Sequence, residues 1–130
     1  MGERKKKKIL VVDDSQVTRN FHAYILRSAG YEVIDAIDGA DALEKLYMHP
    51  EIACVITDLN MPKMDGLTLI GRIREDDAFK DLPIIIVTTL NDSTDKLKGY
   101  EIGANFYIVK PADPKFLVKS IQIALGEMIQ

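Results

Sequence analysis

Short apolar segments alternate with longer amphipathic segments along the whole chain. The apolar segments predict β-strands, because each is short, rich in β-branched residues and followed by an acid or another polar residue. They occupy residues 9–12, 33–37, 54–56, 84–87 and 106–109. The amphipathic segments have apolar residues every three or four positions, which predicts an α-helix after each strand.

Capping residues mark where several of these helices begin and end. Ser15 is suited to cap the first helix, Asp38 starts the second, and Asp113 with Pro114 starts the last. Gly30 stands where a left-handed residue is expected to end the first helix. Each predicted helix has a set of apolar residues that we expect to be buried. In chain order these sets are Val17, Phe21, Ile25 (or Tyr24) and Ala29; Ala42, Leu43, Leu46 and Tyr47; Leu67, Ile70 and Ile73; Leu97, in the polar segment 91–101; and Leu117, Ile121, Ala124 or Leu125, and Met128.

The regular alternation of strand and helix predicts an α/β fold. Strands as apolar as these are typical of a parallel sheet whose two faces are both covered by helices. We therefore expect a doubly wound sheet of five parallel strands with five helices, joined by right-handed crossovers. A chain of 130 residues has room for one core, so residues 1–130 are expected to form one domain, with residues 1–7 as a frayed basic N-terminus.

The composition is that of an ordinary globular protein, with 47% apolar residues and a net charge of −3. This charge argues against nucleic-acid binding, and no apolar segment approaches the roughly eighteen residues that a membrane span requires. The chain is expected to be a cytoplasmic monomer. Cys54, the only cysteine, is expected to be a small core residue, whereas His22 and His49 are expected on the surface.

Residues with reactive or charged side chains stand at the carboxyl ends of four predicted strands. The first strand ends on Asp13 and Asp14, the third on Asp58, the fourth on Thr88 and the fifth on Lys110. In a parallel sheet these ends meet at one edge, where ligands of open α/β sheets bind. Closely spaced carboxylates repel one another and favour a hard divalent cation such as Mg²⁺. With such a cation, Lys110 and Thr88 would hold a phosphoryl group, and Asp58 would be the nucleophile that accepts it.

Each of these residues also has a simpler interpretation when it is taken alone. Asp13 and Asp14 are suited to cap the first helix, Thr88 is a common residue at a strand end, and Tyr107 suits a half-buried strand position. The combination of acids with Lys110 at one edge is what favours a phosphoryl site.

This combination resembles the receiver domain of response regulators, the signalling proteins of two-component systems. The resemblance covers Ile9 to Met128 and is closest to the stand-alone receivers of chemotaxis. It implies the strand order 2-1-3-4-5 of the flavodoxin-like fold. The residues that carry it are Asp13-Asp14, Asp58, Met61-Pro62, Asp65-Gly66, Thr88, Tyr107 and Lys110-Pro111.

The resemblance implies a role for each acid at this edge. Asp58 would accept a phosphoryl group from a phosphohistidine of a sensor histidine kinase, and the domain would catalyse only its own phosphorylation and dephosphorylation. Mg²⁺ would be ligated by the side chains of Asp14 and Asp58, by the backbone carbonyl of Asn60, and by Asp13 through water.

The resemblance further implies how the signal is passed on. Lys110 and Thr88 would bind the phosphoryl oxygens, and the Lys110–Pro111 peptide bond would be cis. Thr88 and Tyr107 would form a switch pair that remodels the face made by the fourth helix, the fifth strand and the fifth helix. The partner at this face would be a flagellar motor component, or a histidine phosphotransfer protein if the domain is a phosphorelay intermediate.

Two residues depart from the family pattern. Ala112 stands where many receivers have an aromatic residue. Leu90 occupies a position at which the residue type varies with the dephosphorylation rate in the family.

Two other function classes are alternatives to a receiver. A Mg²⁺-dependent phosphohydrolase would usually have a second acid where Asn60 stands. A flavin or nucleotide binder needs a glycine-rich or hydroxyl-rich first turn, and Asp13 and Asp14 have the wrong charge for phosphate there.

Overall fold

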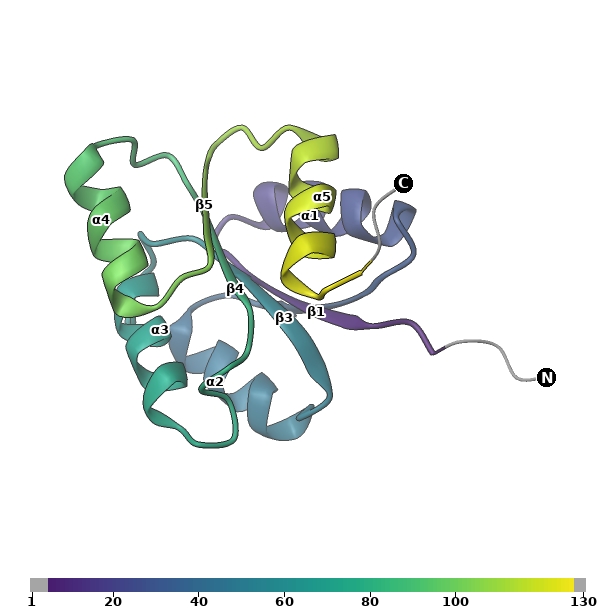
Figure 1. The fold of residues 1–130 in the computed structure, drawn as a ribbon, viewed down its shortest axis with the longest axis horizontal. Coiled ribbons are helices and arrows are strands. Elements are labelled where there is room, and N and C mark those ends of the chain that lie inside the picture. Colours follow the sequence, from purple (N-terminus) through teal and green to yellow (C-terminus); the bar gives the residue numbers. More distant parts are fainter. Residues whose placement is uncertain (1–4, 128–130) are drawn as a thin grey trace.

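The computed structural model describes residues 5–127, and a five-stranded parallel sheet forms the centre of that region (Figure 1). The strand order is β2-β1-β3-β4-β5, which confirms the predicted α/β class and topology. The strands are β1 (Lys8–Val12), β2 (Glu32–Ala36), β3 (Ile52–Thr57), β4 (Ile84–Thr88) and β5 (Phe106–Val109). The helices are α1 (Gln16–Ser28), α2 (Gly39–Met48), α3 (Gly66–Glu75), α4 (Ser93–Ile102) and α5 (Pro114–Ala124).

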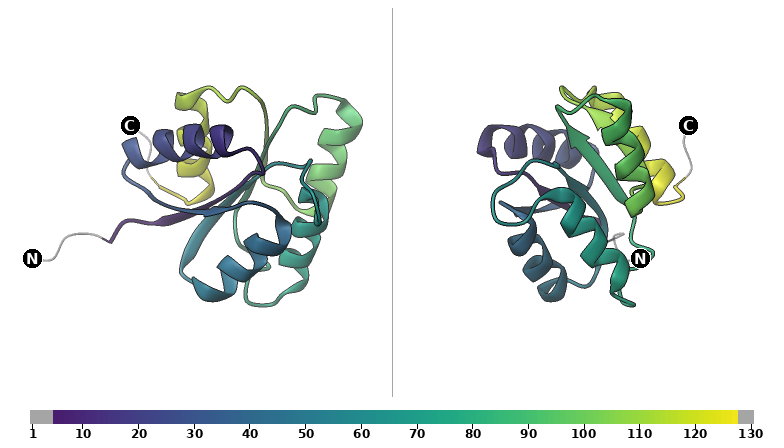
Figure 2. Two further views of the ribbon diagram at one scale, coloured as in Figure 1. Left: turned by 180° about the vertical axis from the view of Figure 1, so that it is seen from behind. Right: turned by 90° about the vertical axis from the view of Figure 1, so that its left-hand side faces the viewer.

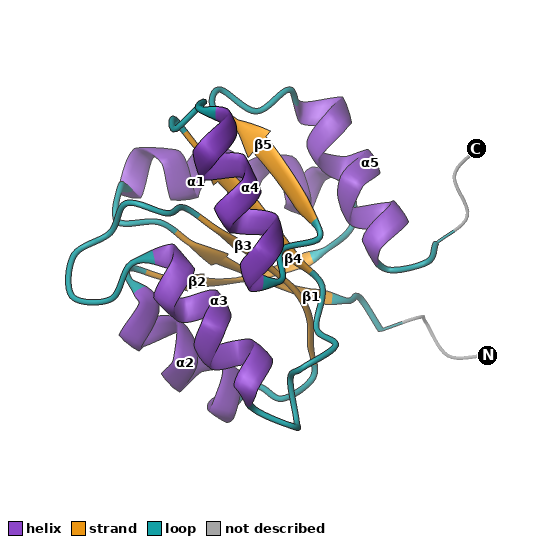
Figure 3. Ribbon diagram, turned by 60° about the vertical axis from the view of Figure 1, so that its left-hand side comes forward, coloured by secondary structure: helices purple, strands orange, loops and turns teal. Residues whose placement is uncertain are grey.

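Helices cover both faces of the sheet. Figures 1 and 2 show α1 and α5 together on one face and α2 and α3 on the other, and Figure 3 shows α4 beside β5. Successive strand residues point to opposite faces, so Leu10 and Val12 pack against α2 and α3, whereas Ile9 and Val11 pack against α1 and α5. The two buried clusters explain why the strands are apolar without alternation.

The predicted helix caps are present in the structure. Gly30 follows α1 with a φ of 95°, a conformation that costs glycine less than any other residue. Pro114 occupies the first position of α5, where its missing N–H costs no hydrogen bond. Side-chain oxygens accept hydrogen bonds from backbone N–H groups in the first turns of four helices, and these capping residues are Ser15, Asp38, Asp65 and Asp113.

Helix α4 differs from the prediction in its buried residue. Leu97 was predicted to be its clearest core contact, but 58% of Leu97 is exposed. Gly99 is the buried residue of α4, and a Cβ atom there would lie 2.7 Å from Ile86 Cδ1 and 3.1 Å from the Tyr107 ring. The helix therefore approaches β4 and β5 through a residue without a side chain, which leaves its leucine on the outer surface.

The buried face of α1 is also rotated from the predicted one. Val17 and Phe21 were predicted to be buried, but they are 81% and 44% exposed. The buried residues of α1 are Ala23, Ile25, Leu26 and His22. The expectation of a surface position for His22 was therefore wrong. On α2, Tyr47 is likewise 64% exposed, whereas Leu46 beside it is buried.

The chain ends differ in part from the predicted frayed N-terminus. Residues 1–4 and Met128 lie outside the described residues. Lys7 is ordered by the fold, because its carbonyl oxygen accepts a hydrogen bond from Glu32 N–H at 3.0 Å and its ammonium lies 3.3 Å from Glu127.

Cys54 is fully buried, as predicted, and burial raises the pKa of its thiol to about 12.

At the carboxyl ends of the strands, three backbone hydrogen bonds continue the sheet. Asp58 N–H donates to Val12 O at 3.0 Å, and Lys110 N–H donates to Thr88 O at 2.8 Å. Asp13 N–H donates to Ala36 O at 3.1 Å. These bonds fix the backbone of the residues that follow β1, β3 and β5, so the side chains at this edge have set positions.

Candidate functional site

Asp58 lies directly after β3 and is only 9% exposed. Its Oδ1 accepts a hydrogen bond from Leu59 N–H at 2.7 Å, and its Oδ2 lies 3.0 Å from Lys110 Nζ. Both carboxylate oxygens are therefore held, one by the backbone and one by a fixed cation. The side chain is positioned by the sheet and does not depend on a mobile loop.

Asp13 is 2% exposed and contacts the same lysine. Its Oδ2 lies 2.8 Å from Lys110 Nζ, and its Oδ1 accepts a hydrogen bond from Ser15 N–H at 2.9 Å. The N-cap of α1 is Ser15, which accepts a hydrogen bond from Thr18 N–H. The simpler interpretation of Asp13 as the helix cap is therefore wrong, and its carboxylate faces the lysine at the sheet edge.

Three carboxylates meet at this edge. One oxygen each from Asp13, Asp14 and Asp58 lies within 4.8 Å of the others, with Asp14 exposed and the other two buried. Three acids at this spacing repel one another, and Lys110 supplies one compensating positive charge. The donor set consists of oxygen atoms with one open side, which suits a hard cation such as Mg²⁺ that retains part of its water shell. The side chain of Asn60, two residues after Asp58, is exposed beside this edge of the sheet.

The acids keep Lys110 charged. Burial alone would lower the pKa of Lys110, but its hydrogen bonds to Asp13 and Asp58 and the charges of these acids outweigh burial, so the pKa rises above its usual value. At neutral pH the side chain is therefore an ammonium group with 15% exposure. A positive charge fixed beside a carboxylate can stabilise a phosphoryl group that is transferred to it.

Thr88 and Tyr107 are connected through the backbone of Leu90. Thr88 is fully buried at the end of β4, and its Oγ1 accepts a hydrogen bond from Leu90 N–H at 3.4 Å. The Tyr107 hydroxyl donates to Leu90 O at 2.9 Å. Burial and the charges of nearby acids raise the pKa of Tyr107, so it remains a donor at neutral pH. A shift of Thr88 would therefore act on the same residue that holds the tyrosine.

The loop after β3 folds back over the site through Gly66. A Cβ atom at Gly66 would overlap the Asp58 carbonyl oxygen and lie 2.8 Å from Leu59 Cα. Gly66 N–H also donates to Leu59 O at 2.9 Å, which closes the loop. Earlier in the loop, Lys63 has a φ of 66°, a left-handed conformation that is uncommon for residues other than glycine. Gly66 is one of the residues that carry the family resemblance, but its contact with the Asp58 backbone is visible only in the structure.

The segment after β5 forms the last side of the site. The Lys110–Pro111 peptide bond is cis, the isomer that the resemblance implies, and Ala112 is buried. Next to these residues lies a cavity of about 380 Å³. Lys110 and His22 both line this cavity. His22 was missed as a site residue, because a histidine in an amphipathic segment gives no signal of which face it occupies.

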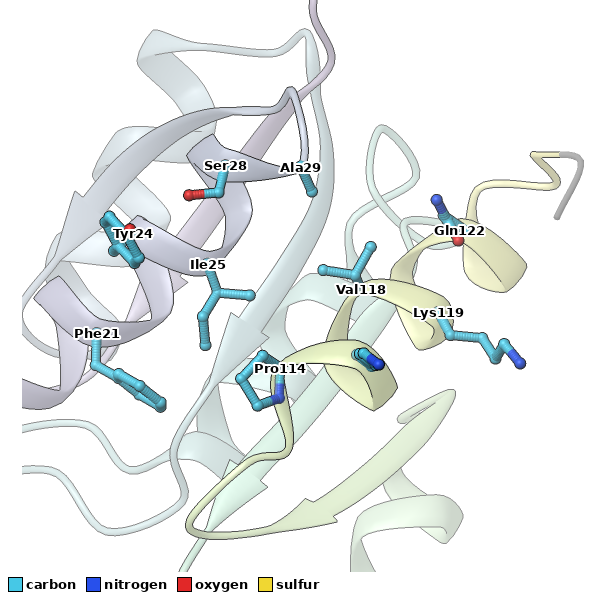
Figure 4. A pocket seen from close by; sticks show the side chains of 10 residues that line it. Phe21, Tyr24, Ile25, Ser28, Ala29, Pro114, Val118, Lys119 and Gln122 are labelled. Carbon is cyan, nitrogen blue, oxygen red and sulfur yellow. The ribbon is translucent and has the colours of Figure 1, made fainter. Parts of the chain in front are cut away.

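A second hollow lies away from the acids. This groove of about 600 Å³ runs between α1 and α5 (Figure 4). Phe21, Tyr24 and Ile25 line one side, and Pro114 and Val118 line the other. None of the three acids contributes to it. The chemistry of the sheet edge and this apolar groove are therefore separate features of the molecule.

Comparison with known protein families shows which family the chain belongs to. The sequence matches the family model described as "Response regulator receiver domain" over residues 9–122. The chain belongs to this family. This receiver domain is thus a protein of two-component signalling, a class whose members are signalling proteins and generally bind Mg²⁺.

Several proteins similar to this chain are chemotaxis receivers. This receiver domain is 41% identical over 120 residues to the chemotaxis protein CheY1 of Helicobacter pylori, covering 92% of this chain and 97% of that protein. Among solved structures, the chemotaxis protein CheY4 of Vibrio cholerae matches with a TM-score of 0.87 and 36% identity, covering 93% of this chain and 100% of that one. CheY in a CheX–CheY–BeF₃–Mg²⁺ complex from Borrelia burgdorferi matches with a TM-score of 0.84 and 34% identity, covering 90% and 87% of the two chains. The chain is therefore a CheY homologue.

Within residues 5–127, no helix is long and apolar enough to cross a membrane.

Proposed function

We propose that this receiver domain is a phosphorylation-dependent switch in which Asp58 accepts a phosphoryl group from a phosphohistidine of a sensor histidine kinase. The observation that carries the proposal is the Lys110 ammonium, which lies 3.0 Å from Asp58 and 2.8 Å from Asp13 beside a third acid. A purely structural ion pair requires one acid, whereas this arrangement leaves two negative charges in excess.

The transfer would occur in line between two partners. An oxygen of the Asp58 carboxylate forms the new P–O bond as the P–N bond of the phosphohistidine breaks, and the leaving imidazole nitrogen takes up a proton. Lys110 exchanges its contact with Asp58 Oδ2 for a contact with the incoming phosphoryl oxygens, which requires only a small movement of its ammonium group. Its positive charge is then fixed where negative charge accumulates in the transition state.

The proposed metal site consists of Asp13, Asp14 and Asp58, with the backbone carbonyl of Asn60 as a further oxygen ligand. The support for Mg²⁺ is the oxygen-only donor set with one exposed acid. Bound Mg²⁺ would neutralise the excess charge of the acids and bind a phosphoryl oxygen. The Borrelia burgdorferi relative, whose structure contains BeF₃ and Mg²⁺, supports the same chemistry here.

The output would pass through Thr88 and Tyr107. A phosphoryl group on Asp58 would attract the Thr88 hydroxyl, which would release Leu90 N–H and alter the backbone that accepts the Tyr107 hydrogen bond. The ring of Tyr107 lies 6.4 Å from that of Tyr100 on α4, so its movement would change the surface between α4 and β5. This surface has exposed apolar side chains on α4 and α5 that suit a protein partner, namely Leu97, Tyr100, Phe116 and Ile123.

The partner at this surface is proposed to be a protein of the flagellar motor. The support is the similarity to chemotaxis proteins of other organisms. A histidine phosphotransfer protein is the other candidate, and the two differ chemically. A motor protein would bind the phosphorylated domain and leave the acyl phosphate in place, whereas a phosphotransfer protein would remove it.

Intact-protein mass spectrometry tests the proposed function. The wild type, Asp58→Asn and Asp14→Asn are each incubated with acetyl phosphate, with Mg²⁺ or with EDTA. The expected result is a mass gain of one phosphoryl group in the wild type with Mg²⁺, no gain in Asp58→Asn, and a much slower gain in Asp14→Asn. An equal gain in Asp58→Asn would show that another residue is the acceptor. No gain in any sample would contradict the proposed function.

A further inference from the structure

His22 is a buried histidine beside the proposed phosphoryl site. It is 2% exposed and lies on the inner side of α1, toward the segment that follows β5. It lines the cavity of about 380 Å³ that Lys110 also lines. The remaining walls are mostly apolar and include Val17, Pro111 and Ala112. The small side chain of Ala112 leaves this space open next to the lysine.

The imidazole and the lysine each have an unused hydrogen-bonding group. Among residues 5–127, no side chain or backbone group forms a hydrogen bond with a ring nitrogen of His22. The Lys110 ammonium has three N–H donors, and within the same residues only Asp13 and Asp58 accept from it. The His22 ring nitrogens are not among the fully enclosed side-chain atoms that lack a partner in this region, so water can reach them. Polar groups in such positions usually bind a protein atom or an ordered water.

The charge states of the two groups are complementary. Burial and then the positive charge of Lys110 lower the pKa of His22, against the opposing effects of Asp13 and Asp58. The imidazole is therefore neutral near pH 7, and a neutral imidazole has one nitrogen that accepts a hydrogen bond. The ammonium offers a donor, and Thr89, which also lines the cavity, has a hydroxyl group.

We propose that a water molecule in this cavity bridges His22 and the third N–H of Lys110, and that His22 thereby positions the ammonium for the reaction at Asp58. Residues with polar side chains, among them His22, Lys110 and Thr89, line the cavity, and an ordered water requires such polar groups around it. This inference rests on the proposed function, because it assigns His22 to the phosphoryl transfer that Lys110 assists. His22 is a positioning residue that acts through Lys110 and does not touch the phosphoryl group.

The bridge would matter most when the phosphoryl group arrives. Lys110 must then leave Asp58 Oδ2 for a phosphoryl oxygen while it retains Asp13. An ammonium held both by Asp13 and by the water molecule bound to His22 turns toward the phosphoryl oxygen about a fixed axis. An ammonium held by Asp13 alone has more orientations to lose, so it stabilises the transition state less.

Two substitutions at His22 separate hydrogen bonding from packing. His22→Leu fills a similar volume without an acceptor, whereas His22→Gln retains an amide oxygen that accepts a hydrogen bond. The initial rate of phosphorylation by acetyl phosphate is measured at saturating Mg²⁺, with the folded fraction of each variant checked by urea unfolding. We expect a decrease of roughly tenfold for His22→Leu and a rate within about threefold of wild type for His22→Gln, the scale of one hydrogen bond to a charged group.

The outcomes distinguish this inference from the proposed function. If the wild type is not phosphorylated, the proposed function fails. If the wild type is phosphorylated and His22→Leu reacts at the same rate, the positioning role of His22 is refuted. If both variants lose activity equally, packing at this position matters and the hydrogen-bond role is refuted.

Nuclear magnetic resonance provides a readout that does not depend on a substitution. The chain has two histidines, and His49 lies beside Glu51 at the opposite end of β3 from the acids. With ¹⁵N-labelled protein, beryllofluoride and Mg²⁺ are added as a phosphoryl mimic. We expect the ring nitrogen resonances of His22 to shift while those of His49 stay unchanged. Unchanged His22 resonances, in a sample whose Asp58 backbone resonance does shift, would overturn the proposal.

Discussion

Replacing Asp58 with asparagine removes one of three clustered charges and keeps the shape of the side chain. At an effective dielectric constant of about 20, the attraction between Asp58 and Lys110 at 3.0 Å is roughly 5.5 kcal/mol. The repulsion between Asp58 and Asp13, whose oxygens lie within 4.8 Å, is at least about 3.5 kcal/mol. Asp14 adds a smaller repulsion because it is exposed to solvent. The Coulomb energies of Asp58 therefore almost cancel.

Desolvation then decides the direction of the change. Asp58 is only 9% exposed, and a buried carboxylate carries a desolvation cost that a neutral amide largely avoids. The asparagine oxygen can still accept the hydrogen bond from Leu59 N–H, and Lys110 keeps Asp13 as its partner. We therefore expect Asp58→Asn to be more stable than wild type by about 1–2 kcal/mol without metal.

Urea unfolding in EDTA at pH 7 measures this change. The midpoint of Asp58→Asn is expected to be roughly 0.5–1 M higher than that of wild type, with the same m-value. Glu44→Gln on the exposed side of α2 is the control, and its free energy of unfolding should change by less than about 0.5 kcal/mol. A lower midpoint for Asp58→Asn would refute the argument that the three acids are held together against their mutual repulsion.

Four further predictions follow from the structure. Mg²⁺ at about 100 times its Kd should stabilise wild type by roughly 2.7 kcal/mol, measured by thermal unfolding, and equal stabilisation of Asp14→Ala would place the metal elsewhere. Gly66→Ala should lower the free energy of unfolding, measured with urea, by at least about 2 kcal/mol, because its Cβ overlaps the loop backbone. The control Gly71→Ala, where a Cβ has only ordinary contacts, should be neutral or more stable by up to about 1 kcal/mol. Similar losses for both variants would show that the overlap at Gly66 is relieved. The Cys54 thiol, with a pKa of about 12, should react with a disulfide reagent only after unfolding, and fast labelling of the native protein would contradict its burial. The pKa of His22 is lower in the folded state, so the unfolded state binds more protons as the pH falls below about 6.5. Wild type should therefore lose stability below this pH, and His22→Leu should lose less. Parallel pH profiles of stability for the two proteins would contradict this coupling.

The fold was predictable because its signals are local. Each strand is a short apolar run, and the caps at Ser15, Asp38 and Asp113 mark the starts of their helices independently of tertiary contacts. The second strand begins at Glu32, one residue before the prediction, because its pairing with Lys8 of β1 extends it. The strand ends were predicted well enough to bring the acids and Lys110 to one edge.

The faces of two helices were not predictable from spacing alone. On α1, Val17, Phe21 and Tyr24 recur with helical period but form the exposed side, whereas His22 and Leu26 face the sheet. Two apolar stripes on one helix give the same periodicity, and the packing of α5 against α1 selects between them. On α4 the polar sequence has no clear apolar face, so the close approach of the helix depends on a glycine.

The details of the site depend on contacts between distant segments. The family resemblance implied that Thr88 and Tyr107 act together, but the backbone of Leu90 that connects them appears only in the structure. The same holds for His22, which lines the same cavity as Lys110 although the two are 88 positions apart in the sequence. Local patterns contain no information on such distant contacts.

Locating the phosphoryl group on the chain is the most direct test of the central claim. The protein is phosphorylated with acetyl phosphate and Mg²⁺ and treated with sodium borohydride, which reduces an aspartyl phosphate to homoserine, and the modified residue is identified by peptide mass spectrometry. The account predicts homoserine at Asp58 alone, and only when Mg²⁺ was present. Homoserine at Asp13 or Asp14, or at Asp58 regardless of Mg²⁺, would contradict it.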